Sequence, residues 1–279
     1  MRKLIFHLLI CVVVFAAGAQ DRVAVRYKVS NRDTDRGDVK TYEMMLASSP
    51  DKSLFYNTMS LYVDSCNSTP QGKAALEEIQ MKAWTVVQPD GSVTLDGRKL
   101  GLAPDKNEYL YVEKDRVNKK LKVYDRKAGD LYQYEEPFGE QEWTIVEDST
   151  KNILGFDCLF AYSDYHGRRW NVWFTPEIPI QDGPWKLYGL PGLILAADGA
   201  DDFVVEALEI GTTSQNIPSV YSEDDYDKGE RRRILADHEH YINNFLSRLA
   251  AKGIKLNSDG GSSDLPKYDR KHRAWETDY

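Results

Sequence analysis

The chain has 279 residues, of which 42% are hydrophobic and 29% are charged. Its 44 acidic side chains outnumber 36 basic ones, which gives a formal net charge of −8 at pH 7. This balance argues against nucleic acid as a partner, because binding to phosphates requires a basic face. The length is sufficient for a sizeable core within one domain.

The first 19 residues have the pattern of a cleaved signal peptide. Arg2 and Lys3 form a short basic region, residues 4–16 form an almost unbroken apolar run, and residues 17–19 are small. The run is too short to span a bilayer comfortably, which takes about 20 apolar residues. We therefore expect export, with residues 20–279 forming a single mature domain. The expected location is the periplasm or the outer membrane, or outside the cell.

Most of the mature chain has the pattern of β-strands joined by turns. Apolar and polar residues alternate over residues 23–29, which is the period of a half-buried strand. The dipeptide Asp96-Gly97 lies between two short apolar runs and predicts a tight hairpin turn. Further hairpins are predicted for the segment pairs 121–124 with 131–134, 158–162 with 170–174, and 193–197 with 203–210. Successive hairpins at this spacing predict an antiparallel sheet.

Two segments have helical patterns. Residues 73–82 are rich in helix formers, and Pro70 suits the first helical position. Residues 223–252 carry one apolar stripe, which Gly253 is placed to end. A flexible stretch is predicted at 257–264, and the last residues are expected to pack back as an extended tail. The predicted fold class is α+β, mainly antiparallel β, with a curved sheet or half-barrel and a covering C-terminal helix.

The mature chain keeps two cysteines, Cys66 and Cys158. In an oxidising compartment they can form one disulfide, and the alternative is two separate buried thiols. Their spacing alone does not decide between these. No suitably spaced histidine accompanies them, so we expect no metal site there.

The segment 168–195 has the most unusual composition. An alternating strand leads into a connection that contains three prolines and ends in Gly189-Leu190-Pro191-Gly192 before a continuous apolar run. Proline fixes φ, and glycine permits backbone angles that are closed to other residues. This composition therefore predicts a rigid connection with a defined shape.

These residues carry a resemblance. Residues 189–194 read Gly-Leu-Pro-Gly-Leu-Ile, and upstream pieces at 155–158, 167–170, 173–179 and 183–185 are similar to the same pattern. The chain thus resembles the GLPGLI family of exported Bacteroidetes proteins, a domain of unknown function. The resemblance implies no enzymatic activity. It does imply an accessory role in the cell envelope, beside outer-membrane TonB-dependent receptors.

We interpret the chain as a non-enzymatic binding or accessory protein for an apolar small molecule or lipid, or for an outer-membrane partner. No catalytic motif is present, and no cofactor or metal is expected. Two alternatives remain: an exported hydrolase with a non-standard site near Cys158 and His166, and a structural partner of a TonB-dependent receptor. The candidate binding residues lie in the unusual segment and are Trp170, Trp173, Glu177, Trp185, Tyr188, Leu190 and Pro191, beside the signature loop Gly189, Leu190, Pro191, Gly192, Leu193 and Ile194.

Overall fold

The computed structural model describes residues 22–33, 38–127, 129–139, 141–199, 203–245, 247, 251 and 275–279. The predicted signal peptide, Gly253 and the flexible stretch 257–264 lie outside these residues. Within the part of the chain that is described, no helix is both long enough and apolar enough to cross a membrane.

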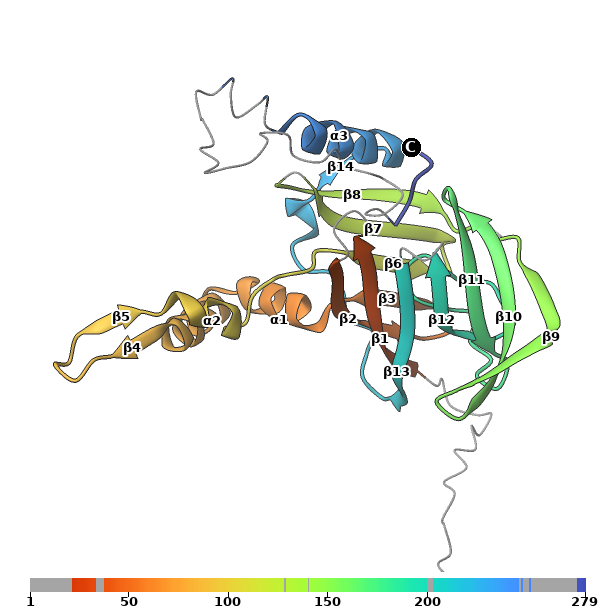
Figure 1. Ribbon diagram of the computed structural model, residues 1–279, viewed down its shortest axis with the longest axis horizontal. Helices are drawn as coiled ribbons and strands as arrows, with labels where there is room; N and C mark the ends of the chain where they lie inside the picture. Colours follow the sequence, from red (N-terminus) through yellow and green to blue (C-terminus); the bar gives the residue numbers. More distant parts are fainter. Residues whose placement is uncertain are drawn as a thin grey trace, which may run out of the picture.

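A single curved sheet forms the body of the protein (Figure 1). Its order is β14-β8-β7-β6-β3-β2-β1-β13-β12-β11-β10-β9, and all neighbours are antiparallel except β14 and β8. The twelve strands are β1 (Arg22–Asp33), β2 (Asp38–Ser48), β3 (Lys52–Tyr56), β6 (Tyr111–Asp115), β7 (Lys120–Lys127), β8 (Asp130–Pro137), β9 (Thr144–Ile153), β10 (Phe156–Tyr165), β11 (Arg168–Thr175), β12 (Leu193–Gly199), β13 (Phe203–Thr213) and β14 (Asp227–Lys228). This architecture confirms the predicted mainly antiparallel fold.

The alternation of residues 23–29 sets which face of β1 is buried. Val23, Val25, Tyr27 and Val29 are at most 1% exposed, while the residues between them are partly exposed. The hydroxyl of Tyr27 donates a hydrogen bond of 2.6 Å to the backbone oxygen of Ile194 on β12. The core therefore continues from the centre of the sheet to the start of β12.

An arm projects from the body between β3 and β6 (Figure 1). It consists of α1 (Thr58–Asn67), α2 (Pro70–Trp84), the two-stranded sheet of β4 (Thr85–Val87) and β5 (Val93–Leu95), and the 3-10 helix η1 (Gly97–Leu102). Helix α2 and Pro70 at its start confirm the prediction. The predicted hairpin turn at Asp96-Gly97 is wrong: β5 pairs with the preceding β4, and Asp96 caps η1 by accepting from Arg98 N.

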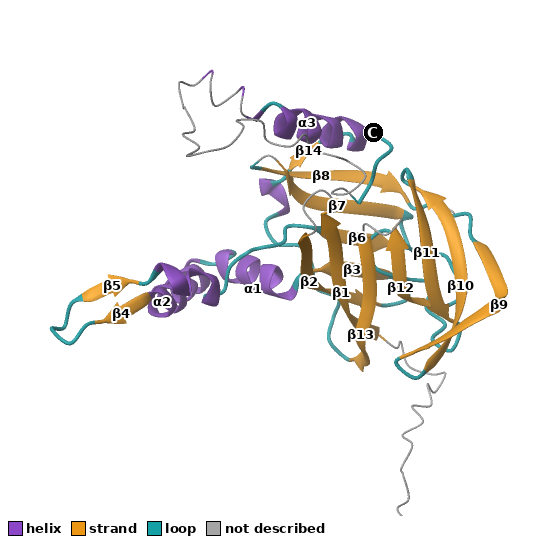
Figure 2. Cartoon of the chain, viewed as in Figure 1, coloured by secondary structure: helices purple, strands orange, loops and turns teal. Residues whose placement is uncertain are grey.

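Helix α3 (Arg231–Asn243) contacts β8 and covers one end of the sheet (Figure 2). The helix begins later than the predicted residue 223, because residues 223–225 form the 3-10 turn η2 and β14 follows it. Glu230 marks the actual start, since its carboxylate accepts hydrogen bonds from the backbone N–H groups of Arg232 and Arg233. The predicted extended tail is present over residues 275–279.

Candidate functional site

The two glycines of the signature loop are required for different reasons. Gly189 has a φ of +93°, in the left-handed region that favours glycine. Gly192 has no such angle, which corrects the sequence interpretation for this residue. A Cβ atom on Gly192 would lie 2.1 Å from the backbone oxygen of Thr175, so only glycine permits this close approach of the connection to β11.

The connection between β11 and β12 folds back onto the strand that follows it. Leu193 N donates to Ile178 O at 3.1 Å, and Ile194 N donates to Asp182 O at 2.9 Å. The side chains of Ile178, Leu187 and Leu190 are buried in the main core. The loop is therefore held by the core, as its proline and glycine content predicted.

The candidate binding residues are distributed over different environments. Trp170, Trp185 and Leu190 are buried within the core. Trp173 lies half-buried beside Phe160, with 5.3 Å between ring centroids, and the exposed Glu177 accepts from the backbone N–H of Asp157. Pro191 is exposed. The structure therefore does not bring the seven residues to one binding surface.

Aromatic rings fill the space behind the signature tryptophans. Trp275 of the C-terminal tail stacks on Trp185 at a centroid distance of 5.4 Å and on Phe203 at 4.6 Å. Trp170 lies 5.2 Å from Trp185 in the same group. Within the described residues, this packing makes Trp170 and Trp185 part of the core. A ligand site would have to lie elsewhere.

The two cysteines are free, so the disulfide alternative is not formed. Cys66 lies on α1 in the arm, and Cys158 is buried near the start of β10. His166 follows the other end of β10, and a rise of about 3.3 Å per residue puts it roughly 25 Å from Cys158. Burial also raises the pKa of the Cys158 thiol to about 11. The two residues therefore do not form the nucleophile and base of a shared site.

A buried ion pair lies beneath the connection. Lys114 Nζ is 2.7 Å from Asp182 Oδ1, and both side chains are completely buried. Arg116 pairs with the other carboxylate oxygen, to which Ser48 also donates at 2.6 Å. Burial opposes ionisation of Asp182, but the charges of Lys114 and Arg116 outweigh it and hold the pKa of this carboxyl well below its usual range. None of Lys114, Arg116 and Asp182 was among the candidate residues predicted from the sequence.

An open depression of about 530 Å³ lies above this ion pair, and we call it the signature depression. It opens between the turn from β6 to β7, the segment after β8, and the signature loop. Its lining is formed by Arg116, Lys119, Phe138, Gly139, Gln141, Gln181, Tyr188 and Gly189. Tyr188 and Gly189 are the parts of the predicted site that reach it.

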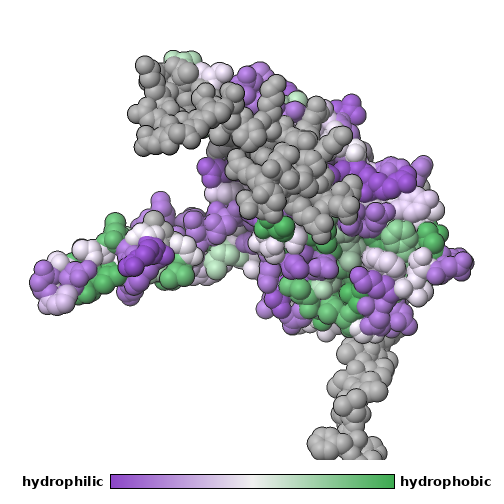
Figure 3. Space-filling view, in the orientation of Figure 1, coloured by the Kyte–Doolittle hydropathy of each residue, from purple (hydrophilic) through white to green (hydrophobic). Residues whose placement is uncertain are grey.

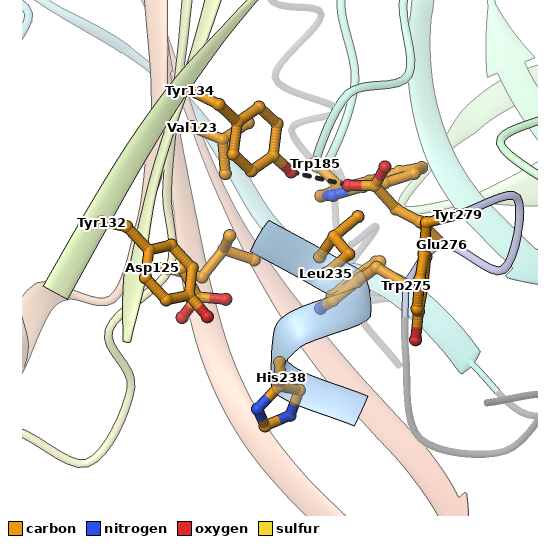
Figure 4. A pocket seen from close by; sticks show the side chains of 11 residues that line it. Val123, Asp125, Tyr132, Tyr134, Trp185, Leu235, His238, Trp275, Glu276 and Tyr279 are labelled. Carbon is orange, nitrogen blue, oxygen red and sulfur yellow. Dashed lines mark hydrogen bonds between the residues drawn. The ribbon is translucent and has the colours of Figure 1, made fainter. Parts of the chain in front are cut away.

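A second charged cluster fixes the C-terminal tail. Arg231 at the start of α3 donates to both carboxylate oxygens of Asp278 at 2.7 Å, and Lys186 Nζ lies 2.8 Å from Glu276 Oε1. Tyr134 donates to the same Glu276 oxygen at 2.7 Å, and these two side chains are among those that line a small cavity of about 30 Å³ (Figure 4). A cavity of this size has room for about one water molecule. We therefore interpret this cluster as a set of ion pairs and hydrogen bonds that holds the C-terminal tail in place, and not as a ligand site.

Part of this cluster has the composition of a metal site. Ligand atoms of Glu136, His166 and Glu276 lie within 4.8 Å of one another. Lys186 and Arg231, however, each pair with both carboxylates. A divalent cation would have to enter beside these two fixed positive charges, which disfavours it electrostatically. We therefore interpret the three residues as members of the ion-pair network.

The arm carries a concentration of exposed apolar side chains. Figure 3 shows hydrophobic patches along it, interrupted by polar residues. The exposed large apolar residues of the arm are Met59, Tyr62, Ile79, Met81, Val87, Val93, Leu95 and Leu102. By contrast, only Leu76 of α2 is buried. Exposed apolar surface gathered on one projection is typical of an interaction site.

One sequence-family model matches a short part of the chain. The sequence model of a family described as a protein of unknown function (Porph_ging) matches residues 166–196, the segment from the turn after β10 to β12. This match supports a relation to an uncharacterised family of the Bacteroidetes type. The chain matches no curated protein.

Two solved structures of PNGF-II, in the C2 and P21 space groups, are similar in fold. Each has 15% sequence identity and a TM-score of 0.48, and the similarity covers 77% and 78% of this chain. The chain spans about a third of their length, with 32% and 33% of those chains covered. At this identity and TM-score, the similarity extends no function to the chain.

Proposed function

We propose that the chain is an exported cell-envelope protein of the GLPGLI type that acts as an accessory protein and binds a protein partner through its arm. The apolar surface of β4 and β5 carries this proposal. Val87, Val93 and Leu95 are between 61% and 70% exposed, and Val87 pairs with Val93 across the two strands. An isolated two-stranded sheet is marginally stable in water, so a surface that covers these side chains would stabilise it.

The chemistry of the arm favours a protein over a lipid surface. The turn between β4 and β5 reads Gln88-Pro89-Asp90-Gly91-Ser92, which is polar and acidic at the point where a membrane-inserting tip would need apolar side chains. The flanks of the arm carry both signs of charge, with Glu78 paired to Lys82 and Asp96 to Arg98. Apolar residues with a mixed polar rim are the usual composition of a protein interface.

The base of the arm is fixed to the body. Lys106 Nζ lies 2.6 Å from Asp64 Oδ2 on α1, and Tyr111 on β6 donates to the same oxygen at 2.6 Å. The amide of Asn57 donates to Glu43 O on β2 at 2.8 Å. These contacts orient the arm, so less conformational entropy is lost on binding than for a free segment. The resemblance makes a TonB-dependent receptor the expected class of partner.

A photo-crosslinking residue at position 95, introduced into the full chain in the cells that produce it, tests the proposal. The matched control has the same residue at Leu208, an exposed apolar position of β13 in the body. We expect one envelope protein to be crosslinked from position 95 and not from 208. The purified partner should then bind the chain, and Leu95→Gln with Val93→Thr should weaken binding about tenfold or more. Equal labelling from both positions, crosslinks between copies of the chain, or unchanged affinity would contradict the proposal.

A further inference from the structure

The signature depression has the size and fixed wall of a small-molecule site, separate from the arm. Its volume of about 530 Å³ lies within the usual range for ligand pockets, roughly 300–1,000 Å³. Phe138 stacks on Tyr188 with ring centroids 3.9 Å apart and planes 15° from parallel. Tyr188 is held in turn by a hydrogen bond from its backbone N–H to Gln141 Oε1 at 3.1 Å and by its own hydroxyl, which donates to Gly139 O. The aromatic wall is therefore formed before any ligand arrives.

The described lining of the depression is cationic, whereas the chain as a whole is acidic. Its described lining contains Arg116 and Lys119 and no carboxylate. Beneath it, the single carboxylate of Asp182 serves two cations, Lys114 and Arg116, which leaves one positive charge in excess. Lys114 completes its bonds with the backbone oxygens of Gly183 and Leu187 at 2.7 and 3.0 Å. In a protein of net charge −8, this fixed positive site selects an anion.

Two polar side chains of the lining are available for a ligand. Within the described residues, Lys119 Nζ and the Gln181 side-chain amide have no hydrogen-bond or ion-pair partner, and Gln181 is exposed. Lys119 stands in a turn with φ of +52°, which fixes where its side chain leaves the backbone. The amide of Gln141 is engaged at both ends, since its oxygen accepts from Tyr188 N and its nitrogen donates to Lys186 O at 2.8 Å. Lys119 and Gln181 can therefore receive a carboxylate and a neighbouring hydroxyl.

We propose that the signature depression binds a small carboxylate carried on a hydroxylated ring, the chemistry of a hexuronic acid. The carboxylate lies at Lys119 and Arg116, a hydroxyl bonds the amide of Gln181, and the C–H face of the ring packs on Phe138. A purely apolar ligand fits less well, because it would desolvate two cations and the Gln181 amide without replacing their hydrogen bonds. This site is independent of the arm and of any partner bound there.

Calorimetry and ligand-observed NMR with the full chain test the assignment, using galacturonate as the probe. Galactose has the same ring without the charge, and benzoate has the charge without the hydroxyls. We expect galacturonate to bind, galactose to bind at least tenfold more weakly, benzoate to bind more weakly than galacturonate, and higher salt to weaken galacturonate binding. Failure of galacturonate to bind, or equal binding of galactose, would overturn the proposal. Tighter binding of benzoate would overturn the assigned ring chemistry.

Two variants locate the site. Lys119→Asn retains a residue that tolerates the left-handed backbone, and Gln181→Ala removes the free amide. Each is expected to weaken galacturonate binding roughly three- to fivefold, as for a partly exposed polar contact. Lys73→Asn makes the same charge change on the exposed surface of α2 and should leave binding unchanged. If Lys119→Asn and Lys73→Asn behave alike, the ligand binds elsewhere and the assignment is wrong.

Discussion

Lys114 Nζ lies 2.7 Å from Asp182 Oδ1, and neither side chain is exposed to solvent. The pair joins β6 to the connection between β11 and β12, two segments that are 68 residues apart. Removing two charges from water is costly, and their attraction compensates only when the remaining hydrogen-bonding atoms are also paired. Here the two carbonyl acceptors of Lys114 and the Ser48 and Arg116 donors to Asp182 meet that condition.

Asp182→Asn is therefore expected to lower the free energy of unfolding by about 3–5 kcal/mol, because it leaves Lys114 and Arg116 without their counter-ion. Urea denaturation followed by tryptophan fluorescence measures this. Asp164→Asn is the matched control: Asp164 also lies 2.7 Å from its partner Arg169, but both side chains are more than half exposed. Its cost should be much smaller, because solvent screens the exposed pair. Similar costs for the two variants would show that the buried pair contributes little.

The glycines of the signature loop give a second prediction. Gly192→Ala forces a Cβ atom against the Thr175 backbone oxygen, so either the loop or β11 must move. The Cβ of Gly189→Ala makes only an ordinary contact with Trp143 Nε1 at 3.9 Å, so this variant is strained only through its φ. We expect Gly192→Ala to be the more destabilising, at about 3 kcal/mol or more against roughly 1 kcal/mol for Gly189→Ala.

Gly189→Asn separates the two causes in the same denaturation experiment. Asparagine tolerates positive φ better than alanine does, so this variant should be more stable than Gly189→Ala. Gly192→Asn should be at least as unstable as Gly192→Ala, because its clash is steric. A rescue by asparagine at position 192, or none at 189, would contradict the two explanations.

The reactivity of the two thiols gives a third prediction. A chain of residues 20–279, which lacks Cys11, should show at pH 8 one thiol that reacts readily with an aromatic disulfide reagent and one that reacts only on unfolding. Cys158 is the slow thiol, because its burial raises its pKa to about 11 and excludes the reagent. Cys158→Ser should leave the fast reaction intact, and Cys66→Ser should remove it. If the native protein had no reactive thiol and reduction released two thiols, the two cysteines would instead form a disulfide.

Local patterns predicted the strands well, because the burial of each strand residue follows directly from the alternation of apolar and polar residues in the sequence. The alternation over 23–29 appears as buried and partly exposed positions of β1, and the turn at His166-Gly167 joins β10 to β11 with both residues at positive φ. The Asp96-Gly97 turn was wrong because an N-cap and a hairpin turn share the same residue preferences. The choice between them depended on β4, a partner strand too short to recognise from its pattern.

The charged groups were less predictable, since their partners are distant in sequence. Lys114 offers one signal: it follows Val112 by two residues and so falls on the face that β6 buries. Nothing local shows that Asp182 lies opposite. In the same way, Glu136, Arg231 and Glu276 resemble solvated surface charges until the fold gathers them. The signature tryptophans were predicted to form a binding site, but Trp170 and Trp185 lie in the core. Large aromatic residues suit both environments, so their presence in the sequence did not distinguish them.

The charged cluster that holds the C-terminal tail predicts how the stability of the protein depends on pH. Burial opposes ionisation of Glu136, but the contact with His166 Nε2 at 3.2 Å and the charge of Lys186 outweigh it and lower the pKa to about 2. Burial likewise opposes ionisation of Asp278, and Arg231 lowers its pKa to about 2. In the unfolded chain these groups titrate near 4, so the folded state gains stability above that pH and loses it as the pH falls towards 2.

We expect the free energy of unfolding to fall between pH 5 and pH 2, with roughly 2–3 kcal/mol of the loss arising from Glu136. Other carboxylates contribute to acid unfolding, so the decisive quantity is the difference from Glu136→Gln, which cannot ionise at this position. The variant should be less stable than the native chain at pH 7, and the two should converge near pH 2. Parallel stability curves over this range would mean that Glu136 has the same pKa in the folded and unfolded states, and that its contacts with Lys186 and Arg231 do not fasten the tail.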